Sequence, residues 1–380
     1  MEDYDDGDIT NKTIIIDNGT CYCKAGFGGK DEPEIVIPTT VGYPLKQINP
    51  YFKKDFYIGN EGKGFRSTLK LSNPIQRGIV ENWDDMEKIW EHIFKNELKI
   101  DPDEYNIIIT EVIMNPKENK EKITQIIFED FNVEGLIIIN PAILDIYSGG
   151  KYSGIVIDSG DGVTQIVPIF DGYSLPHASN CVNFAGSDLT EYMIRLLNEV
   201  GGYYSSSYQK EIVRGIKEKL CYTAFEFDKE LNYCEPSDCI LPDGKEVYIK
   251  DQRIRCPEAF FNPLLIGKEI ESLPKLCFNS IQKVDIDARV EIYKNIILAG
   301  GSTSFKGFEE RFDKEIKILC EKEMKKMEVD VNVIGLPEKI KGAWIGGSVV
   351  SCLTTFKNCF ITKTEYEESG ATIVHRKFYW

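Results

Sequence analysis

Two segments of the sequence, residues 13–24 and 154–165, end an apolar run with an aspartate and follow it with a glycine and a second strand-like run. A tight turn between such runs exposes consecutive backbone N–H groups, and glycine lets an anion approach them closely. Each segment therefore predicts a phosphate-binding hairpin. Asp17 and Asp158 would repel a phosphate unless a cation lay between, so they predict Mg²⁺ held through water molecules. Lys24, on the return run of the first hairpin, is expected to reach a phosphate oxygen.

The alternative interpretation is that each hairpin is an ordinary turn, because an aspartate and a glycine after one strand are common. Two such turns in repeat register, with Gly300 and Gly301 after an apolar run at 296–298, favour a phosphate site. The glycine patterns of the Walker and Rossmann motifs are both absent from the sequence.

Other kinds of site find little support. Cys21 and Cys23 form the only close cysteine pair, and no second pair completes a zinc site. The histidines at 92, 177 and 375 are too scattered to predict a Ser-His-Asp triad.

Composition excludes several classes of protein. The chain has 380 residues and a net charge of −16, so a general nucleic-acid binder is not expected. Its 42% hydrophobic content excludes wholesale disorder. The apolar runs are far too short to span a bilayer, and the acidic residues 2–8 predict a solvated tail rather than a secretory signal. Eleven scattered cysteines are then expected to be reduced thiols.

The remaining patterns predict alternating strands and helices. Residues 9–29 predict a strand, a turn and a strand, and 105–109, 136–139 and 296–298 predict buried strands. Helices are expected at 83–98, capped by Asn82, and at 117–131, 188–200, 209–224, 308–319 and 348–357. Residues 43–73 suggest a small subdomain with an exposed tip near 48–54. The repeated hairpin indicates two similar α/β halves.

Many ordered motifs resemble actin and the actin-like proteins. They are IDNGTCYCKAGFGG, NWDDMEKIW, NPKENKEKITQIIFE, GIVIDSGDGVT, EIVRGIKEKLCY, RCPEAFF, AGGST, WIGGS and ESGATIVHRK, and the resemblance runs from about residue 13 to 377. It implies the ribonuclease H-like fold shared with sugar kinases and heat-shock chaperones, with four subdomains around a central nucleotide cleft. The implied boundaries are 1–38, 74–148 and 342–380 for subdomain 1, 39–73 for subdomain 2, 149–184 and 269–341 for subdomain 3, and 185–268 for subdomain 4.

The resemblance also implies a set of nucleotide contacts for ATP or ADP, with Mg²⁺ or Ca²⁺ held by Asp17 and Asp158 through water. The implied contacts are Gly19, Thr20, Cys21, Tyr22, Lys24, Gly160, Asp161, Gly162, Val163, Gly186, Arg214, Lys217, Glu218, Gly300, Gly301, Ser302, Thr303, Ser304, Phe305, Lys339 and Ile340. Lys339 or Lys341 stands in for the lysine that the family places at Ile340.

Two departures from the family concern hydrolysis. Pro141 occupies the place of the glutamine that orients the attacking water, and Gln165 that of a histidine in the same water network. Losing general-base help typically costs about 10²–10⁴-fold in rate. ATP is therefore expected to bind while hydrolysis is slow or absent. The alternatives are that Gln165 takes over water positioning, since glutamine can orient a nucleophile, or that the changes are neutral.

Further departures affect the family's phosphate exit and assembly surfaces. Arg77, Cys181, Asn183 and Ser187 replace residues near the exit. The loop at 43–55 is shorter than in the family, and Pro50 stiffens its tip. The plug segment at 262–273 has gained charge, and a charged insertion falls at 321–329. Limited self-assembly or a different partner is expected, because head-to-tail contacts need matched surfaces.

A cleft at the base of the molecule is expected to bind partner proteins. Its residues are mostly apolar or aromatic and suit an amphipathic helix, although plain core packing is the alternative. They are Tyr147, Ser148, Gly150, Tyr152, Tyr173, Val350, Leu353 and Cys359.

The expected function is an ATP-binding subunit of a cytoskeletal or other complex, in the cytoplasm or the nucleus. Its partners would be actin-binding proteins, complex subunits or other actin-family chains, with no direct nucleic acid and no membrane span. The alternatives are a filament-forming actin ATPase and, less well supported, a small-molecule kinase of the same fold class.

Overall fold

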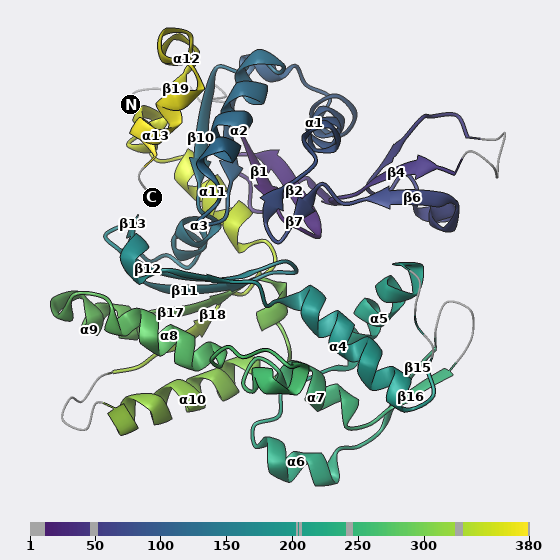
Figure 1. Ribbon diagram of the computed structural model, residues 1–380. Helices are drawn as coiled ribbons and strands as arrows, with labels where there is room; N and C mark the ends of the chain where they lie inside the picture. The colour runs from purple at the N-terminus through teal and green to yellow at the C-terminus, as the bar shows by residue number, and fades with distance from the viewer. Residues whose placement is uncertain are drawn as a thin grey trace, which may run out of the picture.

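The computed structural model describes residues 12–45, 52–202, 204, 207–240, 246–323 and 330–378. Within these residues the chain forms two lobes, one above the other in Figure 1. The expected acidic tail at 2–8, the loop tip at 48–51 and residues 324–329 of the insertion lie outside the described residues.

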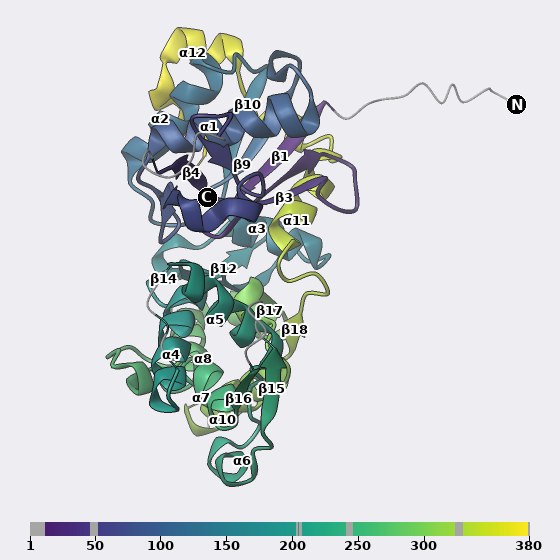
Figure 2. The same ribbon diagram turned by 90° about the vertical axis from the view of Figure 1, so that its right-hand side faces the viewer.

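The upper lobe is built on a mixed sheet with strand order β19-β10-β9-β1-β2-β3. β1, β9 and β10 are parallel neighbours, whereas β2, β3 and β19 run antiparallel to theirs. The isoleucine-rich central strands are buried because helices cover both faces, with α1 and α2 on one side and α11 on the other (Figure 2). Their bounds are β1 Thr13–Asn18, β2 Tyr22–Phe27, β3 Ile35–Pro38, β9 Asn106–Thr110, β10 Gly135–Ile139, β19 Ile361–Thr362, α1 Trp83–His92, α2 Lys117–Glu129, α3 Pro141–Ser148, α11 Gly342–Ser351, α12 Lys363–Ser369 and α13 Val374–Lys377.

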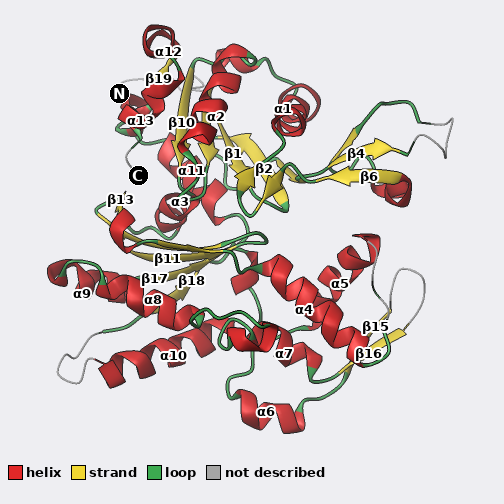
Figure 3. Cartoon of the chain, in the orientation of Figure 1, coloured by secondary structure: helices red, strands yellow, loops and turns green. Residues whose placement is uncertain are grey.

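The lower lobe repeats the arrangement with the order β13-β12-β11-β17-β18, and β14 also pairs with β12. Helices α8, α9 and α10 cover its lower face, while α3 and α11 lie between the two sheets (Figure 3). The bounds are β11 Gly154–Ser159, β12 Thr164–Phe170, β13 Tyr173–Ser174, β14 Asn180–Val182, β17 Ile296–Ala299, β18 Val333–Gly335, α8 Leu273–Gln282, α9 Ile286–Lys294 and α10 Phe308–Glu323.

The internal repeat is confirmed at the level of strand register. Asp17 pairs with Lys24 across the β1–β2 hairpin, and Asp158 pairs with Gln165 across the β11–β12 hairpin. In both lobes the first strand of the hairpin also has a parallel neighbour, β9 or β17. The fold is therefore the expected pair of similar α/β halves.

Each lobe carries an extension beside the central sheets (Figure 1). The upper one is a small sheet with the order β5-β4-β6, which projects away from the lobe. The bounds are β4 Val41–Pro44, β5 Tyr57–Ile58, β6 Leu69–Ser72, β7 Ile75–Gln76, β8 Ile79–Val80, α4 Gly186–Glu199, α5 Ser207–Leu220, α6 Phe227–Tyr233, α7 Gln252–Glu258, β15 Ser237–Ile240 and β16 Glu246–Ile249. The subdomain boundaries given above remain predictions.

Two expected helices differ from those observed. The expected helix at 83–98 is α1 followed by a π-helical turn over Ile93–Leu98, which ends where Lys99 adopts a left-handed conformation. The helix expected at 348–357 is instead α11, and it begins at Gly342. Gly346 is inside this helix because α11 presses on α3: a Cβ at 346 would lie 1.8 Å from the Leu144 carbonyl oxygen. The glycines there serve a close helix contact rather than a turn.

No helix among the described residues is both long and apolar enough to cross a bilayer.

Candidate functional site

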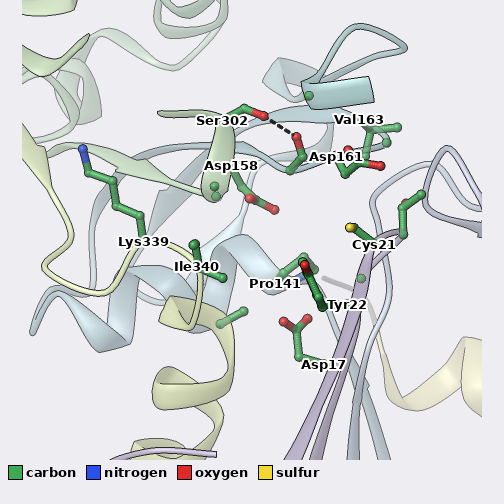
Figure 4. Close-up of a pocket in the computed structure, with 18 of the residues that line it drawn as sticks. Asp17, Cys21, Tyr22, Pro141, Asp158, Asp161, Val163, Ser302, Lys339 and Ile340 are labelled. Atoms are coloured by element: carbon green, nitrogen blue, oxygen red, sulfur yellow. Dashed lines mark hydrogen bonds between the residues drawn. The ribbon is translucent and has the colours of Figure 1, made fainter. Parts of the chain in front are cut away.

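The two hairpin turns face a shared cavity of about 630 Å³ between the lobes (Figure 4). Each turn closes in the same way, because the N–H of Gly19 donates to the Tyr22 carbonyl and that of Gly160 to the Val163 carbonyl, both at 3.1 Å. Most of the site residues expected from the sequence line this cavity. They are Asp17, Gly19, Thr20, Cys21, Tyr22, Lys24, Pro141, Asp158, Gly160, Asp161, Gly162, Val163, Gln165, Gly186, Lys217, Glu218, Gly300, Gly301, Ser302, Ser304, Phe305, Lys339 and Ile340.

Both turns present backbone donors that have no protein acceptor. Among the described residues, no hydrogen bond uses the N–H groups of Thr20, Cys21, Asp161, Gly162 or Val163. Backbone donors away from water are nearly always paired, and successive free N–H groups in a turn form an anion-binding concavity. The arrangement can therefore accept phosphate oxygens from two sides.

The turns are held close by small residues and by a third loop. A Cβ at Gly162 would lie 2.4 Å from the Thr20 hydroxyl oxygen, so only glycine allows this approach. From the loop after β17, Ser302 Oγ donates to the Gly160 carbonyl at 2.7 Å (Figure 4). Gly300 has φ 79°, and a Cβ there would lie 2.3 Å from the Ser159 carbonyl oxygen. The strand-to-helix turn at 300–303 is thereby fixed against the second hairpin.

A buried ion pair lies at the floor of the upper half of the cavity. Lys24 Nζ is 2.6 Å from Asp17 Oδ2, and the Thr110 hydroxyl donates to Asp17 Oδ1 at 2.8 Å. Burial by itself lowers the pKa of Lys24, but the charge and hydrogen bond of Asp17 outweigh it and leave that pKa raised. Lys24 therefore stays protonated and keeps one positive charge at the cavity.

Asp158 lies in the other half of the cavity, across from Asp17 (Figure 4). Burial, followed by repulsion from Asp17, raises the pKa of Asp158 to about 6, against the opposing effects of Lys24 and of a hydrogen bond from Gln165. No three His, Cys, Asp or Glu side chains of the described chain are grouped closely enough to ligate a metal ion directly. The two aspartates suit a hydrated Mg²⁺, which is bound largely through its own water molecules.

The acceptor oxygen of the Gln165 side chain is fully engaged. Its Oε1 accepts from the Ile113 N–H at 2.8 Å and from Asn140 Nδ2 at 3.0 Å, and its Nε2 donates to Asp158 Oδ2 at 3.2 Å. An amide oxygen has two acceptor sites, and both are used here. Gln165, which is 1% exposed, thus has no acceptor left with which to orient a water molecule.

Pro141 lines the cavity at the first position of α3. Asn140 caps this helix by accepting from the Ala142 N–H at 2.8 Å, and proline is favoured directly after such a cap. The same Asn140 side chain donates to Gln165, so the helix start and β12 are joined. Pro141 has no polar side-chain atom and Gln165 has no acceptor site left, so neither residue offers the cavity a free acceptor for a nucleophilic water.

Two expected nucleotide contacts do not line the cavity. Arg214 reaches across from α5, where its Nη1 donates to Cys21 Sγ at 2.8 Å and its guanidinium lies over the Tyr22 ring. Burial, partly offset by Arg214, raises the pKa of Cys21 to about 12 and keeps the thiol protonated. Thr303 is buried beneath the turn and donates to the Ala299 carbonyl at 3.0 Å, so it supports the loop from inside.

One flank of the cavity is apolar and exposed. Ile340 and Lys339 lie on this flank (Figure 4). Ile340 is 54% exposed and lies beside Gly301, and Lys339 donates to the Thr303 carbonyl at 3.2 Å. Burial lowers the pKa of Lys339. Lys217, on the far side, is bound to the Gly186 carbonyl at 2.8 Å. Lys341 pairs with Glu32 outside the cavity, so Lys339 rather than Lys341 stands beside Ile340 at the site.

Arg77 joins the two lobes beside the cavity, at the lining residue Gly162. Its guanidinium donates to the Gly162 carbonyl at 3.0 Å and binds Asp188 of α4 through two nitrogens. Nζ of Lys268, from the plug segment, is 3.2 Å from Asp188 Oδ1, the oxygen that also accepts from Arg77 Nη2. Cys181 on β14 and Asn183, whose carbonyl accepts from Lys268, lie away from the cavity lining, as does Ser187.

The expected partner cleft is only partly exposed. Tyr152 and Tyr173 are each 65% exposed, and Leu353 is 38% exposed. Tyr147 packs edge-on against Tyr152 and Phe356. Val350 is completely buried and has no surface to offer a partner, whereas its neighbour Val349, which sequence reasoning missed, is 45% exposed. Ser148 is held by the Asp145 carbonyl, Gly150 makes a left-handed turn and Cys359 is half-buried.

Sequence reasoning also missed residues that line the cavity or support its lining. Thr110 and Asn140 gave no signal because each is a single polar residue at a strand or helix end. Asp145 lies within an apolar helical segment, PAILDIYS, and an acid at a buried position of such a segment was the signal that could have found it.

The fold and the cavity define a class of protein with two similar α/β lobes around one central anion-binding cleft. A family model described as Actin matches residues 9–379. The chain therefore belongs to the actin family.

Proposed function

We propose that this protein binds ATP or ADP with Mg²⁺ or Ca²⁺ in the cavity, hydrolyses ATP slowly or not at all, and serves as a subunit of a cytoskeletal or other protein complex. The observation that carries the nucleotide part is the set of five unpaired N–H groups on the two opposed hairpin turns. Membership of the actin family supports it.

Different residues of the cavity are proposed to bind different parts of the nucleotide. The turns at 19–22 and 160–163 would hold the β- and γ-phosphates, with Lys24 supplying a positive charge. A bound Mg²⁺ supplies charge neutralisation, and Asp17 and Asp158 would hold it through water. Gly301, Lys339 and Ile340 form the flank on which the adenine would lie, opposite Lys217 and Glu218.

Slow hydrolysis follows from what the phosphate end of the cavity lacks. Pro141 has no side-chain polar group, and the acceptor oxygen of Gln165 already takes two hydrogen bonds. In its alternative role as a water-positioning residue, Gln165 could accept a hydrogen bond from the water only if its bond to Asn140 or to Ile113 were broken. This favours a protein that retains ATP over a filament-forming ATPase.

The experiment is to identify the nucleotide that co-purifies with the protein, by chromatography after heat release, and again after a day in Mg²⁺. Intact ATP would support binding without turnover. ADP appearing within minutes to hours, together with sedimentable polymer, would favour the filament-forming ATPase. Absence of any nucleotide, with no binding of added ATP, would contradict the proposal.

For partners, we propose that an amphipathic helix of an actin-binding or complex-subunit protein docks at Tyr152, Tyr173 and Leu353, the exposed apolar residues of the expected cleft. Other actin-family chains are also proposed partners. The compartment proposed is the cytoplasm and its cytoskeleton, or the nucleus.

A further inference from the structure

Asp145 is a buried carboxylate that has no part in the phosphate contacts proposed for the two hairpin turns. It lies on α3, is 2% exposed and lines the cavity. Its side-chain oxygens make no hydrogen bond and no ion pair with any described residue. A buried ionised carboxylate without a partner is costly, so a group at this place requires a cation or a proton from outside the protein.

The position of Asp145 on α3 places it next to Pro141, at the end of the cavity where the phosphates are proposed to bind. Asp145 follows Pro141 by four positions, which is about one helical turn, so both residues lie on the same face of α3. Both also line the cavity. Helix α3 therefore has no polar side chain at Pro141 but has a carboxylate one turn later, at Asp145.

The charges around Asp145 do not balance it. Asp145, Asp158 and Asp17 all line the same cavity. Burial and then repulsion from Asp158 and Asp17 raise the pKa of Asp145. The positive charge that opposes this rise in the pKa of Asp145 is that of Lys24, whose ammonium is already 2.6 Å from Asp17. The described floor of the cavity thus has an excess of negative charge.

The contact with α11 leaves the carboxylate open toward the cavity. A Cβ at Gly342 would lie 2.4 Å from Asp145 Oδ1, so the oxygen rests on a glycine backbone at the start of that helix. A side chain at 342 would take this space. The helix N-terminus tolerates a negative charge there but does not supply a full positive one.

We propose that Asp145 is a third carboxylate of the cation site and holds the hydrated divalent ion together with Asp17 and Asp158. This inference rests on the proposed function, because the ion arrives with the nucleotide phosphates. Since no three carboxylates meet closely enough for direct ligation, the contact is made through water of the ion's shell.

The test compares the full-length protein with Asp145→Asn by titrating Mg²⁺ against bound fluorescent ATP. The half-saturating Mg²⁺ concentration is expected to rise by about 10- to 100-fold, the usual cost of removing a group that supports a metal shell. In EDTA, the variant is expected to bind ATP as well as the wild type or better, because a charge that repels phosphate is gone. A merely structural role would weaken both.

Glu111→Gln is the matched control, since Glu111 is a buried carboxylate that does not line the cavity. Its Mg²⁺ dependence is expected to equal that of the wild type. Asp145→Ser, which is smaller and also uncharged, should reproduce the effect of the amide.

Each other outcome overturns the inference. Unchanged Mg²⁺ dependence in both Asp145 variants would leave nucleotide binding intact and remove Asp145 from the cation site. Loss of folding of both variants in EDTA would show that the carboxylate stabilises the fold itself. If the wild type bound no ATP, the proposed function would fail first, and this inference with it.

Discussion

At the scale of single residues, the phosphate end of the cavity is governed by how its amides are held. Asn140 caps α3 and at the same time donates to Gln165, and Gln165 donates to Asp158. The bonds from Asn140 and from the Ile113 N–H occupy both acceptor sites of Gln165, which lines the cavity. Gln165 is therefore left without a free acceptor at the place where water would be activated.

A glutamine introduced at position 141 should increase the rate of ATP hydrolysis. Pro141→Gln keeps the Asn140 cap and adds a side-chain oxygen at the first position of α3. Single-turnover ATP cleavage is expected to speed up by about 10²-fold, the lower end of what proton-transfer help contributes.

Pro141→Ala is the control for this experiment, because it removes the ring without adding an amide. Equal rates for both variants and the wild type would mean that the slow step lies elsewhere.

Glu111 should make stability depend on pH. Its Oε2 has no hydrogen bond among the described residues and is 3.4 Å from Lys120 Nζ, and burial raises the pKa of Glu111 from 4.5 to about 7, although Lys120 and Asn115 oppose the change. The folded state keeps a proton that the unfolded state releases. The free energy of unfolding should therefore fall as pH rises from about 4.5 to about 7, by up to about 1.4 kcal/mol per unit, and stay level above.

Urea unfolding of the wild type and Glu111→Gln at pH 5 and pH 8 measures this effect. The wild type should lose up to about 3 kcal/mol more than the variant between the two pH values. Parallel losses would show that Glu111 titrates normally in the folded state.

At the scale of elements, contacts between α4, the loop at Arg77 and the plug segment join the two lobes next to the cavity. Asp188 accepts two hydrogen bonds from Arg77 and faces Lys268 at 3.2 Å. Lys268 also donates to the Asn183 carbonyl and lies over the Phe184 ring. One carboxylate thus joins the upper lobe and the plug segment to α4.

Asp188→Asn should speed the release of nucleotide. The variant keeps the side-chain shape but loses both ion pairs, and Arg77 is partly exposed, so the expected effect is a moderate one of about 1 kcal/mol, or roughly fivefold in dissociation rate. Stopped-flow chase of fluorescent ATP measures the rate.

Glu191→Gln, an exposed pair-forming acid on the same helix, should leave the rate unchanged. An unchanged or slower release from Asp188→Asn would exclude the idea that these contacts hold the lobes together around the nucleotide.

At the scale of the whole molecule, the two lobes share one cavity, and a ligand that bonds to both hairpin turns would hold the lobes together. ATP at 100 times its dissociation constant should therefore raise the free energy of unfolding by about 2.7 kcal/mol. Differential scanning calorimetry across an ATP series in Mg²⁺ measures the shift.

Adenosine is the control ligand, because it lacks the phosphates that the turns are proposed to hold. A shift as large with adenosine as with ATP would contradict the phosphate site.

The sequence by itself determined the features that depend on short stretches of chain. An apolar run, an aspartate and a glycine suffice to specify each hairpin, because the strand pattern and the turn residues are local, and their repetition specified two similar halves. The matching motifs were long enough to indicate the family, and most of the site residues that they implied line the cavity, although seven other lining residues, Asp145 among them, were not expected.

Tertiary structure decided what depends on contacts between distant segments. Three observations follow from the packing of elements that are far apart in the chain. The acceptor oxygen of Gln165 is bonded to Asn140 and Ile113, and Gly346 lies inside a helix against Leu144. Val350 is buried while Val349 is exposed. Asp145 is the clearest case. Its residue type is visible in the sequence, but its lack of a partner arises only when α3, α11 and the two hairpins surround it.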